Sequence, residues 1–342
     1  MSGGLSRDRR TYALPISLVV LVISAASAFC VGRYPLAPGA LVRFLLSTMR
    51  LGTMAPDRAH LIRSIIVDSR MPRILGAILV GAALSISGAS YQAVFRNPLV
   101  SPGSLGVLSG AGFGAAVAIV LGGHALIQPF AFVGGIAAVA CGVGVARLFG
   151  EGSIVMLVFG GLISNALFTA LLSILKYGAD ADNQLPDIVF WLLGSLAGIA
   201  PRQLLVMVVP LCIGIVLLAG AGRMLDALAM SDDEARTLGV PVTALRYGVI
   251  VLATIVSALT VSLVGMIGWI GLVIPHVARL LVGPGNARLL PLSACLGAIF
   301  LLVSDGLART LFVEEVPLGI LTDLIGVVLF LCVLPRVRTG WT

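Results

Sequence analysis

Two arginines stand directly ahead of a long apolar run. Arg70 and Arg73 occur in the stretch RMPR, one helical turn apart, so a helix that begins here carries both on one face. An exposed guanidinium offers a planar fork of donors that binds a carboxylate bidentately. The spacing therefore predicts a basic surface for an acidic protein partner; the alternative is contact with phospholipid headgroups at a helix end.

Two acids fall inside apolar runs, where a charge needs a partner or water. Asp305 precedes Arg309 by four residues, so we expect an ion pair that positions the arginine. Asp323 follows Thr322 in the last apolar run, where it either lines a pathway or lies shallow enough to meet water. A charge at the centre of a bilayer costs about 2.5–3.5 kcal/mol on insertion scales. An ion-gradient-driven secondary transporter that uses Asp323 or Asp305 is the alternative function.

A polar segment, residues 222–246, interrupts the apolar runs. Its middle has the pattern of a helix N-terminus, a capping hydroxyl followed by acids that face the positive end of the helix dipole: Ser231, Asp232, Asp233 and Glu234. Gly239 is expected to end that helix and Pro241 to begin another. Two short helices joined by a tight break would form a compact cytoplasmic unit, which suits a transporter driven by a separate motor protein.

Motifs for catalysis are absent from the sequence. The chain has no GxxxxGK[ST] loop to cradle ATP phosphates, no HExxH, no CxxC and no GxSxG. Its three histidines, His60, His124 and His276, are far apart in the sequence. We therefore expect no enzyme, no metal site and no cofactor bound by this chain, with ATP and magnesium held by a partner ATPase.

The composition is typical of a polytopic membrane protein. Of 342 residues, 59% are hydrophobic and 11% are charged, against roughly 25% charged residues in soluble domains. The net charge of +7 comes from arginines scattered at the ends of apolar runs, without a basic stripe, which argues against nucleic acid as a partner. The five cysteines lie within apolar runs and predict no disulfide framework.

Ten apolar runs predict an all-α protein with about ten transmembrane helices and both termini on one side of the membrane. Outside the long loop 33–73, twelve inner against three outer basic residues favour the cytoplasm for that side. The runs lie near residues 13–32, 72–94, 104–122, 127–147, 154–175, 201–221, 245–264, 268–283, 289–308 and 317–334. We expect a single permease-like domain, 1–342. The segment 33–71 is expected to be a periplasmic loop with an amphipathic surface helix, because apolar residues recur in it at helical spacing: Leu41, Phe44, Leu45 and Met49.

Seven stretches, in order along the chain, carry a family resemblance. They are RMPR at 70–73, FRNPLVSPG at 95–103, VFWLLGSL at 189–196, DDEARTLGV at 232–240, IGLVIPH at 270–276, LLVSDGLAR at 301–309 and EVPLGILT at 315–322. Together they resemble the FecCD-type permease family, the membrane subunits of ABC importers for cobalamin, iron-siderophores and haem. The resemblance implies a permease dimer on two ATP-binding cassette ATPase subunits, loaded by a periplasmic substrate-binding protein.

The resemblance also implies roles for single residues. The residues expected to dock the binding protein are Arg70, Arg73 and Arg309. Those expected to form the cytoplasmic gate are Asn97, Leu99, Gly152 and Ser153. Those expected to couple to the ATPase are Ser231, Asp232, Asp233, Glu234, Arg236, Leu238 and Gly239. We further expect polar residues of two helices to line the pathway: Ser164, Asn165, Thr169, Thr322 and Asp323. The sequence departs from the family pattern at Asp323, where a small apolar residue is usual, and at 327–329.

The sequence thus predicts the membrane subunit of a binding-protein-dependent importer. We expect a homodimer in the bacterial inner membrane, in contact with lipid, that moves a metal-chelate type substrate with energy from a separate ATPase. Iron-siderophore or haem is the first expectation for the substrate, and cobalamin or an oxoanion stays open, because the binding protein makes most of the selection.

Overall fold

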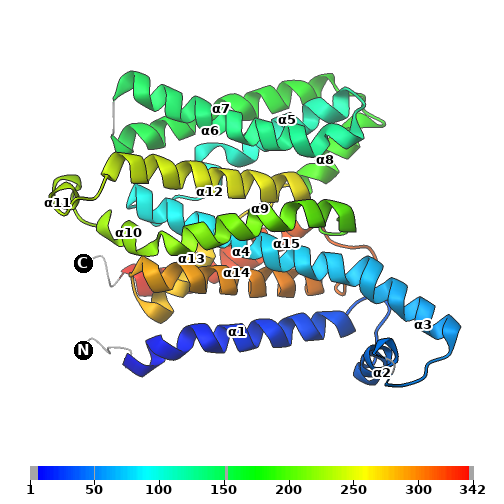
Figure 1. The fold of residues 1–342 in the computed structure, drawn as a ribbon. Helices are drawn as coiled ribbons and strands as arrows, with labels where there is room; N and C mark the ends of the chain where they lie inside the picture. Colours follow the sequence, from blue (N-terminus) through cyan, green and yellow to red (C-terminus); the bar gives the residue numbers. More distant parts are fainter. Residues whose placement is uncertain (1–6, 50, 151–152, 339–342) are drawn as a thin grey trace.

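A computed structural model describes residues 7–49, 51–150 and 153–338, and in this part of the chain the structure is helical without strands. Figure 1 shows long helices lying side by side in a bundle. The long helices are α1 (Arg7–Cys30), α4 (Met71–Phe95), α5 (Val107–Val120), α6 (Ile127–Phe149), α7 (Ile154–Gly178), α9 (Pro201–Gly220), α12 (Val242–Val264), α13 (Ile270–Val282), α14 (Asn286–Ala308) and α15 (Leu318–Arg338). Each of the ten predicted runs falls on one of them.

Length and hydropathy separate these helices into two groups. Seven helical stretches of the described residues are long and apolar enough to cross a membrane, and α5, α13 and the described part of α15 are shorter apolar helices. The helix α8 (Gln184–Leu193) was not predicted. Its ten residues are too few to span a bilayer, so hydropathy averaged over the length of a span does not reveal it.

The segment 33–71 is more helical than predicted. The expected surface helix exists as α2 (Pro38–Thr48), and it packs through Phe44 against Ile62 and Ile66. The prediction of a loop up to residue 71 is wrong, because α3 (Pro56–Arg63) continues through a π-helical segment, Ser64–Arg70, into α4. The result is one helical run of 40 residues, Pro56–Phe95.

The centre of the bundle is α4, which is buried along most of its length against α14, α12, α13 and α9. Glycines permit this close packing. A Cβ at Gly81 would lie 2.3 Å from the carbonyl oxygen of Gly297, and a Cβ at Gly88 would lie 1.9 Å from that of Gly271. The glycines of α5 do the same against α6, since Gly110 faces Gly134.

The two ends of the bundle differ. Two short helices, α10 (Gly222–Ala227) and α11 (Asp232–Thr237), lie at one end of the bundle in Figure 1, together with both chain ends of the described structure. We call residues 222–241 the elbow and this end the elbow end. The opposite end carries α2, α3 and α8.

Candidate functional site

A cluster of charges lies at the end opposite the elbow. Arg73 Nε lies 2.6 Å from Asp305 Oδ1, and Arg73 Nη1 lies 2.8 Å from Glu315 Oε2. Arg309 Nε lies 3.0 Å from Asp305 Oδ2, so the predicted ion pair four residues apart is confirmed. Asp305 is completely buried. Two guanidiniums therefore neutralise it at the mouth of the bundle.

The remaining arginine contacts tie down the chain that follows α1. Arg70 donates to the carbonyl oxygens of Phe29 and Tyr34, and Arg309 Nη1 donates to that of Val31 at 3.1 Å. Arg70 and Arg309 are only 5% and 7% exposed. The expectation of exposed guanidinium forks is wrong for these two residues, because backbone carbonyls and a buried acid already occupy them.

Within the elbow, α11 begins with the predicted cap. Ser231 Oγ accepts from the backbone N–H of Glu234 at 3.3 Å, and the Glu234 carboxylate accepts from that of Ser231 at 3.0 Å. These bonds lower the pKa of Glu234. Gly239 follows with φ of +77°, as expected for a glycine that ends a helix. The first turn of α11 is thus specified by its own sequence.

Asp232 fastens the elbow to the membrane helices. Its carboxylate accepts from Arg96 Nη2 at 2.6 Å and from Arg246 Nη2 at 2.9 and 3.0 Å. Partial burial acts to raise the pKa of Asp232, but the bonds from Arg246 and Arg96 outweigh it, so the pKa is lowered. Arg96 also donates to the carbonyl oxygen of Leu228 at 2.6 Å. Asp232 therefore faces inward rather than toward a partner protein.

Other elbow residues do face outward. Asp233 and Arg236 form an exposed pair at 3.3 Å, and Leu238 is 65% exposed. The prediction of two short helices on either side of the break at Gly239 and Pro241 is wrong for the second helix, because the helix that follows Pro241 is the long α12. The second short helix of the elbow is α10, which precedes α11. The elbow therefore presents a mixed charged and apolar surface at the end of the bundle.

The predicted gate residues near the elbow end have local structural roles. Asn97 Oδ1 accepts from the backbone N–H of Leu99 at 2.9 Å and holds a tight turn after α4, which leaves Leu99 54% exposed. Ser153 caps α7 by accepting from the N–H of Met156 at 3.4 Å. Gly152 lies outside the described residues. A gating role stays a prediction.

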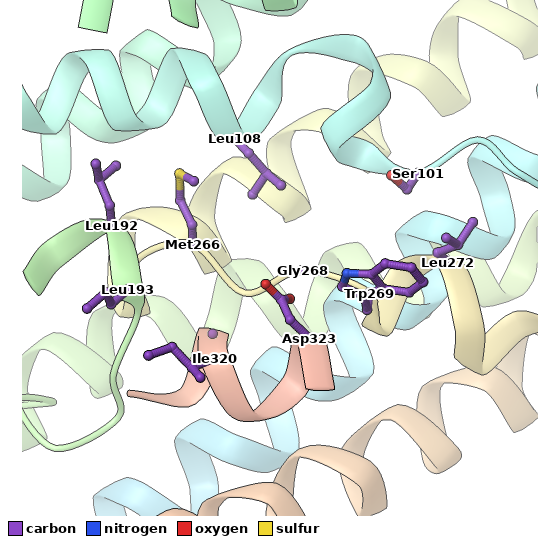
Figure 2. Close-up of a pocket in the computed structure, with 11 residues that line it drawn as sticks. Ser101, Leu108, Leu192, Leu193, Met266, Gly268, Trp269, Leu272, Ile320 and Asp323 are labelled. Atoms are coloured by element: carbon purple, nitrogen blue, oxygen red, sulfur yellow. The ribbon is translucent and has the colours of Figure 1, made fainter. Parts of the chain in front are cut away.

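A pocket of about 340 Å³ lies where the end of α8, the stretch between α12 and α13 and the first turns of α15 meet. Figure 2 shows Asp323 reaching from α15 toward the backbone of Gly268, with Trp269 beside it and Met266 and Leu108 on the far wall. A Cβ at Gly268 would lie 2.7 Å from Asp323 Oδ1, so only glycine leaves this approach open. Asp323 forms no ion pair with any described residue.

Of the five predicted pathway residues, Asp323 lines this pocket and the others do not. Ser164 is completely buried and donates to the carbonyl oxygen of Ala138 at 2.5 Å, so it joins α7 to α6. Thr322 is completely buried and donates to that of Gly319 at 3.0 Å. Neither hydroxyl reaches this pocket, since each points at a carbonyl, and a place for Ser164 and Thr322 along the pathway stays a prediction. Asn165 is half-buried and Thr169 exposed.

Sequence reasoning missed the irregular stretch between α12 and α13. Gly265 has φ of +76°, and Trp269 has φ of +62°, which is uncommon for a bulky residue. The signal that could have found it is the repeated glycine in GMIGWIG, since glycine lowers helix propensity and favours positive φ. Met266, Gly268 and Trp269 of this stretch line the pocket. The described residues contain no group of three His, Cys, Asp or Glu suited to a metal.

A family model, several known proteins and a solved structure relate this sequence to the same family. The sequence matches the FecCD transport family over residues 18–336. It is 37% identical to the molybdate import system permease protein MolB of Haemophilus influenzae, over 94% of this chain and 95% of that protein. It is 40% identical to a probable iron chelatin transport system permease protein of Helicobacter pylori, over 80% of this chain and 83% of that protein.

A haemin permease and one solved structure are also similar to this chain. Identity to the hemin transport system permease protein HmuU of Yersinia pestis is 38%, over 80% of this chain and 83% of that protein. A solved structure described as an inward-facing conformation of an ABC transporter assigned to the metal-chelate type superimposes with a TM-score of 0.83, at 36% identity, over 94% of this chain and 98% of that chain.

Proposed function

The chain belongs to the FecCD transport family and is a permease subunit of an ABC importer, and we propose that it moves a metal chelate, an iron-siderophore or haem, across the bacterial inner membrane. The single observation that carries the substrate class is Asp323, the one charged side chain that lines the pocket. A carboxylate repels a compact oxoanion such as molybdate, whereas a large chelate can present a neutral or cationic face to it.

A second substrate, molybdate, is favoured by a different observation. The relative of Haemophilus influenzae named as a molybdate permease is similar over 94% of this chain. The two proposals differ in the expected effect of Asp323→Asn. Removal of a repelling charge would raise oxoanion transport, whereas it would leave chelate transport unchanged or lower it.

We further propose the partners of the complex. The exposed side of the elbow, with Asp233, Arg236 and Leu238, seats in an ATPase subunit, while Asp232 passes the motion of the elbow to α4 and α12. Two ATPase subunits, with their ATP and magnesium, serve two copies of the permease. The chain itself then binds no cofactor.

At the opposite end, the proposed docking surface for the binding protein centres on Arg73. Its side chain is 11% exposed and already bridges Asp305 and Glu315, so an acidic partner can compete with Glu315 for it. Arg70 and Arg309 hold the chain around Val31 beneath that surface. They support the docking site instead of forming its contact face.

The test is the ATPase activity of the complex reconstituted in lipid. A binding protein loaded with iron-siderophore or haem should stimulate hydrolysis and uptake, and one loaded with molybdate should not. Stimulation by the molybdate-loaded protein alone would contradict the substrate proposal. The same vesicles test the alternative of a secondary transporter that uses Asp323: uptake driven by an ion gradient without ATP would overturn the importer mechanism itself.

A further inference from the structure

A second cavity lies away from the candidate site, between α6 and α12. It has a volume of about 380 Å³, and its walls are almost wholly apolar: Ile136, Val139, Val143, Ile250, Val251 and Ile255 are among the residues that line it. These two helices lie side by side in Figure 1. We call this cavity the α6–α12 groove. The transport proposal makes no use of it.

A single cation marks the elbow end of the groove. The Arg147 guanidinium carbon lies 4.7 Å from the ring centroid of Tyr247, and both residues line the groove. Arg147 is exposed, and no acid of the described residues lies within ion-pair distance of it. Stacking on Tyr247 holds the guanidinium at the mouth of the groove while its N–H donors stay available.

The dimensions fit one leaflet of a bilayer. From Ile136 to Arg147 the groove follows α6 for about 16 Å at the rise of an α-helix. Half of the hydrocarbon core of a bilayer is about 15 Å. A chain that lies along the groove would therefore reach the bilayer centre when its headgroup is level with Arg147.

From this geometry we propose that the α6–α12 groove binds one anionic phospholipid, such as phosphatidylglycerol, from the leaflet at the elbow end. An acyl chain lies against the apolar walls, and the phosphate accepts from Arg147. The groove ends where α12 follows the elbow, and Asp232 ties the elbow to Arg246 on that helix. The bound lipid thus contacts the helix that the elbow moves.

The test measures the retention of dioleoyl phosphatidylglycerol by the purified full-length permease in detergent, by native mass spectrometry. Arg147→Gln should weaken retention about fivefold, equivalent to about 1 kcal/mol for one basic contact, and Arg147→Lys should keep most of it. Gly144→Phe fills the groove, because a Cβ at Gly144 has no atom within 4 Å, and it should weaken retention while leaving Arg147 in place. Arg223→Gln, an exposed arginine on α10, is the matched control and should retain the lipid.

Each other outcome counts against the groove. Equal loss in Arg147→Gln and Arg223→Gln would show general surface charge, and full retention in Gly144→Phe would show that no acyl chain lies there. Retention of dioleoyl phosphatidylethanolamine as strong as that of phosphatidylglycerol would remove the role of Arg147. The thermal unfolding of each variant without added lipid, and its oligomeric state by light scattering, separate lipid loss from misfolding or from a groove covered by a second copy.

Discussion

Buried charge is the main theme at the scale of single residues. Asp305 is inaccessible to solvent, and its buried negative charge is compensated by Arg73 and Arg309. When one partner of a buried ion pair is removed, the charge that stays behind is uncompensated, and this costs more than the pair itself contributes. The cluster at this end is therefore a point where one substitution has a large effect.

We expect Asp305→Ala to lower the free energy of unfolding by about 3–5 kcal/mol, because buried Arg309 loses its acidic partner and Arg73 keeps only Glu315. Glu315→Ala is the control. Its side chain is 30% exposed, so the loss there should be about 1 kcal/mol or less. Denaturant unfolding in detergent measures both. Equal losses in the two variants would contradict the assignment of Asp305 as the centre of the cluster.

Close contact between helices is the feature that matters at the scale of elements. The α4–α14 and α4–α13 contacts bring backbones together at Gly81 and Gly88, which leaves no room for a side chain. Small residues are common where membrane helices pack this closely. These glycines therefore allow α4 to pack closely against α14 and α13.

Gly88→Ala should destabilise the protein by at least about 1–3 kcal/mol, because the new methyl group would meet the carbonyl oxygen of Gly271. Gly248→Ala on α12 is the matched control: no atom lies within 4 Å of its Cβ, so the substitution should be neutral or stabilising by about 0.5–1 kcal/mol. The apparent Tm in detergent reports the difference. A stable Gly88→Ala variant would show that α4 and α13 can separate without loss.

The attachment of the elbow should depend on pH. The pKa of Asp232 is lower in the folded protein than its ordinary value of about 3.9, so its contribution to stability is present above that value. The contribution is lost as the pH falls below about 3.9 and through the lowered pKa. Hydrogen exchange of residues 231–239, corrected for intrinsic rates, should show faster opening only in acid. Asp232→Asn should show it at neutral pH, and the exposed Asp233→Asn should not.

Local and distant contacts differ in how far the sequence predicts them. The Ser231 cap and the Asp305–Arg309 pair lie within one turn of their own helices, so spacing alone predicts them. The Arg73–Asp305 pair joins residues 232 positions apart, and no single-sequence pattern encodes it. For the same reason the burial of Arg70 was missed, since its partners are carbonyls of another segment.

The direction of a hydroxyl is also beyond the sequence. Ser164 and Thr322 were expected in the pathway because they are polar residues in apolar helices. Thr322 instead satisfies the carbonyl of Gly319 in its own helix, which is possible at any angle around the helix axis, and Ser164 satisfies that of Ala138 on the neighbouring α6. The ten long helices were predictable because hydropathy over about 20 residues is a strong signal, whereas α8 is too short to produce it.

Sidedness is the property that matters at the scale of the whole molecule. The described ends of α1 and α15 lie with the elbow, and the loop between α7 and α8 lies at the opposite end (Figure 1). The importer proposal places the elbow in the cytoplasm, where an ATPase can reach it. That placement makes the two ends of the bundle differ in chemical accessibility.

In a cysteine-free background, Asp182→Cys should react with a membrane-impermeant maleimide added to intact cells, because Asp182 is exposed in the loop before α8. Asp233→Cys on the elbow should react only after the cells are opened. Mass tagging of the purified protein measures both. The reverse pattern would invert the molecule in the membrane and remove the basis for ATPase coupling at the elbow.

The helical run Pro56–Phe95 also constrains how the length of this chain can vary. Its 40 residues span about 60 Å, with Arg70 and Arg73 bound to other segments partway along it and Arg96 bound to Asp232 just beyond its end. One inserted residue between Arg73 and Arg96 would turn the far end by about 100°, so both sets of contacts could not form together. Surface loops can accept insertions and deletions. This segment has to keep its number of residues, although individual residues in it can be substituted.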